Sequence, residues 1–326
     1  MIGGENNMPN IATSKRVLVF GSYVTDLCGR ASCFPQPGET IKGNCFKLGP
    51  GGKGSNQAVA AKRAGADVTF ITKLGNDTLG RKALEFYEAE KMATDSIFID
   101  DSKDTGAALI VVNEQTLQNQ IVVIGGACEN FVEEDMPGIL RQVAQADILL
   151  LQLETNMEPV RAILKYAREC GTFIVLNPAP AQILEDELYR CVDIITPNET
   201  EAQFLTGVQV TDQNSAQKAA QELICKGVEK VVITMGSKGA YAHDRKQEQF
   251  VDVVDCGAVV DTTGAGDAFS GGLVAALAQG FDFFDAVVYG STVAGIAVTR
   301  QGTAPAMPYR EEIDEMFTGI KGDDAK

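Results

Sequence analysis

The sequence predicts an α/β fold in which a doubly wound, mainly parallel sheet is flanked by helices and a small second β-sheet is attached. Three observations predict it. Short apolar runs rich in Val, Ile and Leu recur without polar alternation, helical patterns separate them, and two β-rich stretches have no helix beside them. With 326 residues, 45% hydrophobic and 22% charged, the chain is long enough for one large α/β domain or two ordinary ones.

The apolar runs are the expected strands of the main sheet, each of three to six residues: Val17–Gly21, Val68–Thr72, Ile148–Leu153, Phe173–Asn177, Ile194–Thr196 and Val231–Thr234. Helical patterns lie between them: Ser55–Ala64, Gly80–Lys91, Met136–Gln145, Glu158–Cys170, Glu199–Leu205 and Asn214–Gly227. Two Ala/Gly-rich apolar helices, Gly266–Gln279 and Phe284–Arg300, follow in the last third and are expected to pack closely.

Residues 28–48 and 105–124 break the alternation of strands and helices. The first stretch carries Phe34–Thr40, which is rich in Pro and Gly, and the second reads as a hairpin with a polar turn near Asn113–Asn119. We expect a small sheet that covers a ligand as a lid or pairs with another subunit; an ordinary surface hairpin is the alternative. The domain prediction is therefore a flexible tail over residues 1–15 and one α/β domain over residues 16–320.

Charge and cysteine usage exclude several classes of protein. The formal net charge of −16 argues against nucleic acid or an anionic membrane as the main partner, since both require basic patches. The eight cysteines show no C-x-x-C spacing, so we interpret them as reduced packing thiols of a cytoplasmic protein. No run approaches a transmembrane helix, and His243, the only histidine, excludes a multi-histidine metal site.

The strongest local motif is Asp261-Thr262-Thr263-Gly264-Ala265-Gly266-Asp267, which runs directly into a helix. The two glycines leave the free N–H groups of the first helical turn open, at the positive end of the helix dipole, and so form an anion hole. A carboxylate beside it, Asp267, suits a general base that takes a proton from an attacking hydroxyl. The local alternative is that Asp267 only complements the dipole and Gly264 only makes a turn.

A second motif is Gly49-Pro50-Gly51-Gly52-Lys53-Gly54-Ser55-Asn56-Gln57. It matches G-x-G-x-x-G formally, but it is not in the first strand–turn–helix unit and no acidic residue ends the following strand, which disfavours a dinucleotide site. Gly54 stands where a Walker A loop requires Ser or Thr. We interpret the run as a polar substrate pocket, in which Lys53 and Asn56 supply donors.

Two further motifs follow strands. Asn198-Glu199-Thr200-Glu201 suits hydrated Mg²⁺ on a phosphate, or an ordinary helix N-cap with an acidic first turn. Thr234-Met235-Gly236-Ser237-Lys238-Gly239 either cradles a phosphate or nucleotide through backbone donors or simply turns the chain.

Taken together and in order, these blocks resemble the ribokinase family of sugar kinases, the PfkB-type carbohydrate kinases, over about Arg16–Met316. The other matching blocks are Gly21-Ser22 with Asp26, Pro37–Thr40, Leu151–Glu154 and Asn177–Pro180. The ordered set is specific and is most similar to the ribokinase and deoxyribokinase branch. The resemblance implies a ribokinase-like fold with a β-sheet lid over about 28–48 and 105–124, and homodimerisation through that lid.

The resemblance also implies MgATP-dependent phosphorylation of the 5-hydroxyl of a pentose. Asp267 would be the catalytic base, and the anion hole would be Gly264, Ala265 and Gly266. The sugar would be bound by Val24, Asp26, Gly52, Lys53, Asn56, Glu154 and Asp267. The nucleotide would be bound by Asn198, Thr234, Gly236, Ser237, Gly239, Ala265, Gly266 and Ser291. Asn198 and Glu201 would serve Mg²⁺ through water. A K⁺ ion would lie against mostly backbone groups of Asp261, Thr263, Ala297, Arg300, Gly302 and Ala306, the last standing where ribokinases often carry Ser.

One departure from the family pattern bears on the sugar. Ribokinases usually read Gly-Ser-x-Asn-x-Asp, whereas this chain has Val24 in place of the Asn that would bond the 2-hydroxyl. An apolar residue here is similar to deoxyribokinase, so we expect activity on both D-ribose and 2-deoxy-D-ribose. The alternatives are another PfkB-type sugar or nucleoside kinase, or a non-catalytic sugar sensor.

Overall fold

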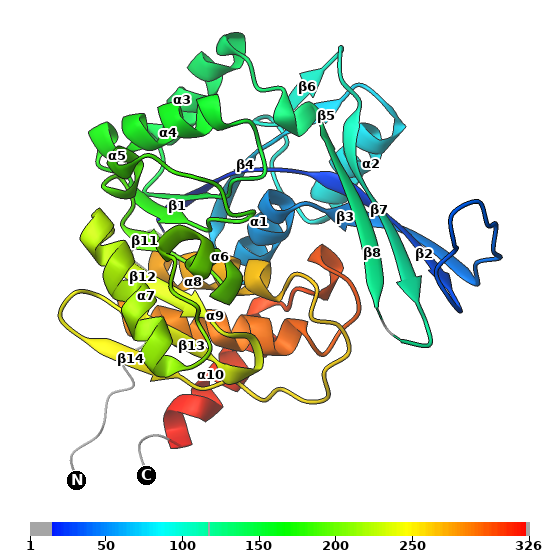
Figure 1. The fold of residues 1–326 in the computed structure, drawn as a ribbon. Coiled ribbons are helices and arrows are strands. Elements are labelled where there is room, and N and C mark those ends of the chain that lie inside the picture. Colours follow the sequence, from blue (N-terminus) through cyan, green and yellow to red (C-terminus); the bar gives the residue numbers. More distant parts are fainter. Residues whose placement is uncertain (1–14, 117, 324–326) are drawn as a thin grey trace.

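The structure is a computed structural model that describes residues 15–116 and 118–323, so residues 1–14 of the expected tail lie outside it. An eight-stranded sheet runs through its centre in the order β14-β13-β12-β11-β10-β9-β1-β4 (Figure 1). The strands are β1 (Arg16–Phe20), β4 (Asp67–Ile71), β9 (Ile148–Leu151), β10 (Phe173–Leu176), β11 (Ile194–Ile195), β12 (Lys230–Thr234), β13 (Ala240–His243) and β14 (Glu248–Val251). The expected doubly wound, mainly parallel sheet is confirmed, since β4, β1, β9, β10, β11 and β12 pair in parallel.

Helices cover both faces of this sheet. They are α1 (Lys53–Arg63), α2 (Thr78–Ala89), α3 (Met136–Val143), α4 (Met157–Cys170), α5 (Asp186–Tyr189), α6 (Glu199–Thr206), α7 (Gln213–Lys226), α8 (Ala265–Ala278), α9 (Phe283–Ala297) and α10 (Arg310–Asp323). Alternate residues of β1 enter two separate cores: Val17 and Val19 pack with α1, α2, α8, α9 and α10, and Leu18 and Phe20 pack with α3 to α7. Among the described residues, no helix is both long and apolar enough to cross a membrane.

The expected close packing of the two Ala/Gly-rich helices, α8 and α9, is confirmed. A Cβ on Gly290 of α9 would lie 2.8 Å from the carbonyl oxygen of Phe269 in α8, and one on Gly272 of α8 would lie 2.6 Å from Val293. Only glycine permits this approach at the crossing.

The sequence reading missed the antiparallel edge formed by β13 and β14. These two strands are joined by a tight turn in which the Asp244 carboxylate accepts from the backbone N–H groups of Lys246 and Gln247. A hairpin needs no crossover helix, so the alternation that revealed the parallel strands gives no signal here. The short helix α5 and the C-terminal helix α10 were not predicted either.

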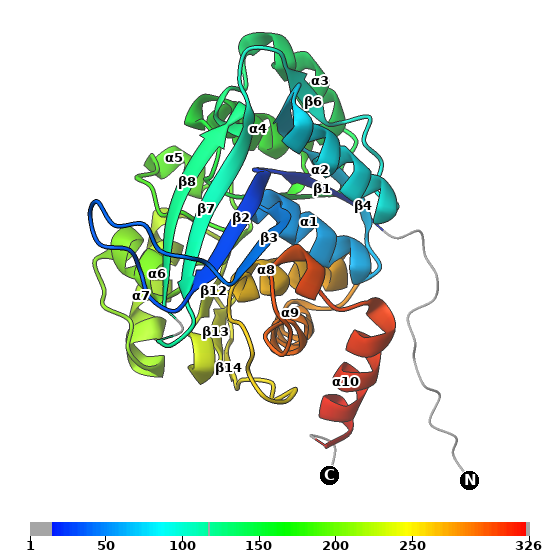
Figure 2. The same cartoon turned by 90° about the vertical axis from the view of Figure 1, so that its right-hand side faces the viewer.

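A second sheet of four strands, in the order β3-β2-β7-β8, stands beside the main one (Figure 2). Its strands are β2 (Val24–Ala31), β3 (Cys45–Gly51), β7 (Thr105–Asn113) and β8 (Asn119–Gly126). The sequence reading placed its first part at residues 28–48, but the sheet begins at Val24 and extends to Gly51. It therefore includes Val24 and Asp26, two of the residues expected to bind the sugar. A two-stranded sheet of β5 (Lys73–Gly75) and β6 (Phe98–Asp100) completes the fold.

Candidate active site

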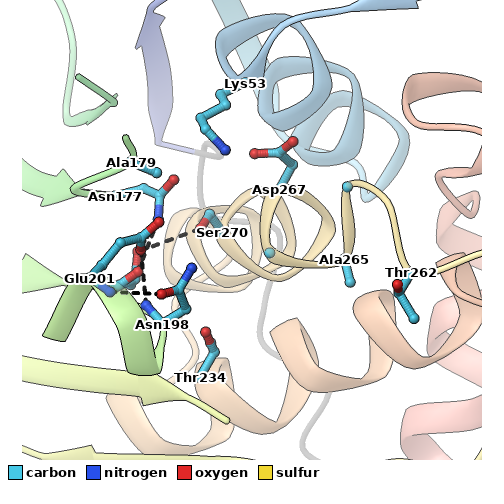
Figure 3. A pocket seen from close by; sticks show the side chains of 13 residues that line it. Lys53, Asn177, Ala179, Asn198, Glu201, Thr234, Thr262, Ala265, Asp267 and Ser270 are labelled. Carbon is cyan, nitrogen blue, oxygen red and sulfur yellow. Dashed lines mark hydrogen bonds between the residues drawn. The ribbon is translucent and has the colours of Figure 1, made fainter. Parts of the chain in front are cut away.

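A cleft opens at the carboxyl ends of the parallel strands, where ligands bind in open α/β sheets (Figure 3). Lys53 and Asp267 face each other on one side, and Asn177, Asn198 and Glu201 lie across from them. The cleft is lined by Lys53, Asn177, Ala179, Thr196, Asn198, Glu201, Thr234, Thr262, Gly264, Ala265, Gly266, Asp267 and Ser270. Residues from four distant motifs of the sequence thus meet in one place.

The N-terminus of α8 forms the floor of this cleft. Its N-cap, Gly264, has φ 78° in the left-handed region, a conformation that glycine adopts without strain. A Cβ on Gly266 would meet no protein atom within 4 Å, so the protein itself does not require glycine there. The space beside Gly266 is therefore open at the positive end of the helix dipole, which suits an anion, while the Ala265 N–H donates to the Thr262 carbonyl at 3.2 Å.

The Asp267 carboxylate is held by two side-chain amides of α1. Asn56 Nδ2 donates to Oδ2 and Gln57 Nε2 donates to Oδ1, each at 2.9 Å. Helix α1 comes this near because α8 carries Gly271, where a Cβ would lie 2.5 Å from Ala60 Cβ. Burial raises the pKa of Asp267, whereas the positive charge of Lys53 and these amides lower it. Asp267 is 7% exposed, so a buried carboxylate is presented to the cleft.

Lys53 and Glu154 form the polar wall next to Asp267. The Lys53 backbone N–H donates to Glu154 Oε2 at 2.9 Å, and the Ser22 hydroxyl donates to the same oxygen. Burial alone would lower the pKa of Lys53, but the charges of Asp267, Glu154 and Glu201 outweigh it and raise that pKa. The ammonium group therefore remains charged among three carboxylates.

Asp26 reaches this wall from strand β2. A Cβ on Gly51 would lie 2.3 Å from Asp26 Oδ1, so the glycine of the neighbouring strand leaves room for the carboxylate. Burial, together with the charges of Glu154 and Asp267, raises the pKa of Asp26 to about 6. Three carboxylates near one another suit a ligand rich in hydroxyl groups, which would donate to them.

Asn198 and Glu201 lie across the cleft, at the N-terminus of α6. Asn198 Oδ1 accepts from the Glu201 backbone N–H at 2.8 Å, and Glu201 Oε2 accepts from the Asn198 backbone N–H at 2.9 Å. This is a capping box, so the helix-cap reading holds while both side chains still line the cleft. Burial raises the pKa of Glu201. An amide and a carboxylate fit a hydrated Mg²⁺ ion.

The structure gathers only some of the expected nucleotide residues at this cleft. Thr234 lines it, but Gly236, Ser237 and Gly239 lie in the turn after β12, and Ser291 lies on α9, outside its lining. The sequence reading assigned no role to five lining residues: Asn177, Ala179, Thr196, Thr262 and Ser270. The sequence does carry a signal for three of them: Asn177, Ala179 and Thr196 come at or shortly after the carboxyl end of a strand, where ligand-binding residues are expected.

The two segments expected to hold K⁺ meet beside α8. The backbone N–H of Gly302 donates to Asp261 Oδ2 at 3.1 Å, and those of Val260 and Asp261 donate to the Val298 carbonyl. Ala306 follows in the short 3₁₀ turn Ala304–Ala306 and is buried. These contacts bring together Asp261 and Gly302, two of the residues that the resemblance assigns to K⁺.

Most of the chain matches one known protein family. The family model described as "pfkB family carbohydrate kinase" matches residues 14–310. The chain is 42% identical to the ribokinase of Haemophilus influenzae over 303 residues, 93% of this chain and 98% of that protein. It is 35% identical over 303 residues to the deoxyribokinase of Salmonella typhimurium, 93% of this chain and 98% of that protein.

Solved structures of ribokinases also match the fold of this chain. The ribokinase of Thermotoga maritima matches with a TM-score of 0.84 and 32% identity, covering 93% of this chain and 99% of that one. The Arabidopsis thaliana ribokinase, solved with ribose and ATP, matches with a TM-score of 0.86 and 27% identity, covering 94% of this chain and 99% of that one.

Proposed function

The chain belongs to the pfkB family of carbohydrate kinases, and from this premise we propose that it transfers the γ-phosphoryl group of ATP to the 5-hydroxyl of D-ribose or 2-deoxy-D-ribose. One observation carries the proposal. A buried carboxylate, Asp267, lies at the open N-terminus of a helix, in the same cleft as Lys53, Asn198 and Glu201.

The proposed mechanism gives each side of the cleft one task. Asp267 takes the proton of the 5-hydroxyl as its oxygen attacks the γ-phosphorus and the bond to the β-phosphate oxygen breaks. The N–H groups of Gly264, Ala265 and Gly266 donate to the oxygens of the moving phosphoryl group. Lys53 is charged beside them and offsets negative charge on that group.

The sugar is held on the second-sheet side of the cleft. Asp26, Glu154 and the Asn56 amide accept from or donate to its hydroxyls, and Gly52 permits close approach of the backbone. Gly52 has φ 89°, and a Cβ there would lie 2.8 Å from Tyr23 Cα. We propose that the second sheet acts as a lid, since its strand β2 carries Asp26 into the sugar side.

Two metal ions belong to the proposal. Mg²⁺, held through water by Asn198 and Glu201, would neutralise charge on the ATP phosphates. K⁺, held by carbonyls and the carboxylate of the 261–263 and 297–306 segments, would stabilise the turn that precedes the anion hole. The proposed ligands are Asp261, Thr263, Ala297, Arg300, Gly302 and Ala306.

Val24 supports deoxyribose as a second acceptor. It is 5% exposed and lies two residues before Asp26 in β2, so both side chains are on the same face of the strand. An apolar side chain there offers no hydrogen bond to a 2-hydroxyl and suits a CH₂ group instead.

A coupled assay of ADP release tests the function with D-ribose, 2-deoxy-D-ribose and D-fructose, each with and without K⁺. We expect ADP release with the two pentoses and stimulation by K⁺. ATP turnover with none of these sugars, or only with fructose, would reject the pentose kinase proposal.

We also propose that the chain forms a homodimer through the outer face of the second sheet. Strand alternation places five exposed apolar side chains on the face opposite Asp26: Phe46, Leu48, Leu109, Val122 and Ile124. Phe46 is 66% exposed and Val122 60%, which is unusual for apolar side chains grouped on one face. Because this apolar face is the same on every copy, a two-fold related second copy can cover it.

Sedimentation velocity tests the dimer with Val122→Lys. The matched control is Val123→Lys, because Val123 is also on β8 and 53% exposed but points to the opposite face. We expect the first variant to be monomeric and the second to remain dimeric. A monomeric wild type, or the same response from both variants, contradicts the proposal.

A further inference from the structure

Gln57 is a fully buried amide that does not line the cleft, yet it contacts the Asp267 carboxylate. Its Nε2 donates to Asp267 Oδ1 at 2.9 Å and to Asn177 Oδ1 at 3.0 Å. Its Oε1 accepts from Gln152 Nε2 at 2.6 Å. Both amide hydrogens and the carbonyl of Gln57 therefore have partners.

These hydrogen bonds fix the orientation of the Gln57 amide, that is, which side its NH₂ and its carbonyl face. If the amide turned over, its carbonyl would face the Asp267 carboxylate, and its NH₂ would face the NH₂ of Gln152. Asn177 is fixed in the same way, because its Nδ2 donates to the Thr196 carbonyl at 2.9 Å. Asn56, the other donor to Asp267, is not fixed in this way, since its Oδ1 has no partner within the described residues, and neither has Gln152 Oε1. The orientation of the Gln57 amide therefore depends first on the oxygens of Asp267 and Asn177, to which it can only donate.

The backbone around this network is kept free of side chains. A Cβ on Gly21 would lie 2.0 Å from Gln152 Oε1, and a Cβ on Gly271 would lie 2.6 Å from the Gln57 carbonyl oxygen. Glycine at the end of β1 and within α8 therefore makes room for the amides. Gln152 and Asn177 come from two other segments and meet at the Gln57 amide, which alone of the three donates to the Asp267 carboxylate.

We infer that Gln57 is a positioning residue for Asp267, and that Gln152 and Asn177 lock its amide so that it can only donate. The donated hydrogen bond fixes the rotation of the carboxylate and favours its ionised form, which is the form a base requires. The inference rests on the proposed function, since it assigns a task to a residue behind the proposed base. It goes beyond that function because Gln57 is fully buried and does not line the cleft.

Charged groups on several elements also influence the pKa of Asp267, and the experiment must separate their effects from that of Gln57. Lys53 faces it from α1, Glu154 from the segment after β9, Asp26 from β2 and Glu201 from α6. The pKa of Asp267 is raised by burial and lowered by Lys53 and by the hydrogen bonds from Gln57 and Asn56. Measuring kcat at saturating sugar limits the contribution of Asp26, because bound sugar hydroxyls hold Asp26 ionised.

The experiment compares the acid limb of the kcat–pH profile in the wild type and in Gln57→Leu. Loss of one hydrogen bond to a charged group moves the limb upward by ~1 pH unit, while the KM for the sugar changes less than about threefold. Gln57→Glu, which places a second carboxylate against the first, moves the limb further. Gln152→Leu, which only unlocks the Gln57 amide, moves it less.

Ser55→Ala is the matched control. Ser55 is a buried neighbour on α1 whose Oγ accepts from the Tyr87 hydroxyl at 2.8 Å. Its loss lowers the melting temperature and leaves the pH profile in place. A shift of the limb in this control equal to that in Gln57→Leu, or no shift in Gln57→Leu, overturns the inference.

A direct titration separates this inference from the proposed function. The ¹³C NMR signal of the Asp267 carboxyl, assigned with Asp267→Asn, reports its pKa in the folded protein whether or not any sugar is phosphorylated. A higher pKa in Gln57→Leu or Gln152→Leu supports the inference, and an unchanged pKa overturns it. Absence of pentose kinase activity in the wild type would instead reject the proposed function.

Discussion

Replacing Asp267 with asparagine tests the proposed base with little disturbance of the structure. The carboxylate accepts from Asn56 on Oδ2 and from Gln57 on Oδ1, so the new NH₂ must face one of these donors. It takes the Asn56 side, because Asn56 Oδ1 lacks a partner in the described part of the chain and that amide can turn over to accept. Gln57 stays in place, since Gln152 donates to its carbonyl.

The expected loss is in kcat. General-base catalysis contributes about 10²–10⁴-fold, or about 3–5 kcal/mol in the barrier. Sugar affinity loses at most one hydrogen bond of about 1 kcal/mol, which is about fivefold in Kd. The melting temperature should not fall, because the substitution removes a carboxylate whose pKa is raised by burial.

The assay measures kcat by coupled ADP release and sugar binding by titration calorimetry. Asp26→Asn is the matched control, since it removes another carboxylate of the same wall, away from the helix N-terminus. The control should raise KM more than it lowers kcat. An Asp267→Asn enzyme that keeps its kcat within about threefold of the wild type would refute the base assignment.

Four further predictions concern residues of the proposed site. Because the pKa of Asp26 is about 6, kcat/KM for the pentose should fall as the pH drops through about 6, and in Asp26→Asn this fall should be less steep, since only the acid limb of Asp267 remains. The sign for stability is opposite: a carboxyl pKa above its ordinary value makes the free energy of unfolding decrease as pH rises from about 4 to about 6, measured by urea denaturation without sugar. Val24→Asn should raise kcat/KM for ribose relative to deoxyribose by about tenfold, since a hydrogen bond is gained; an unchanged ratio contradicts the role of this position. Gly266→Ala should keep the wild-type melting temperature, because its Cβ meets no protein atom, and should lower kcat at least about tenfold by obstructing the anion hole. Full activity in that variant would place the phosphoryl group elsewhere.

Much of the fold and of the cleft could be predicted from the sequence because the signals are local. The helix after Gly266 follows from two glycines and an apolar run, and the strand before Asn198 follows from the short run Ile194–Thr196. Family resemblance, which rests on the order of such blocks, is confirmed by the match over residues 14–310. Wherever a functional residue sits at the end of a predicted element, its place at the sheet edge is predictable.

The remaining features depend on contacts between distant segments. Gln57 was part of a quoted motif, but its contact with Asp267 requires α1 to cross α8 at Gly271, and nothing in either segment alone indicates that crossing. Asn177 and Thr196 were likewise visible as strand ends without an assigned task. Asp26 was expected to bind sugar, but its location on a second sheet depends on pairing with residues 45–51 and 105–113.

Helix α1 links the cleft to the C-terminal segment, and this constrains how the helix can change length. It begins at Lys53 in the cleft and ends at Arg63, whose guanidinium donates to the carbonyls of Pro305 and Met307 and pairs with Glu90. Deleting one residue between these ends would rotate one end relative to the other by about 100° and shorten the helix by about 1.5 Å. Either Asn56 and Gln57 would turn away from Asp267, or Arg63 would release the C-terminal turn. A single-residue insertion or deletion within this helix should therefore break one of these two sets of contacts.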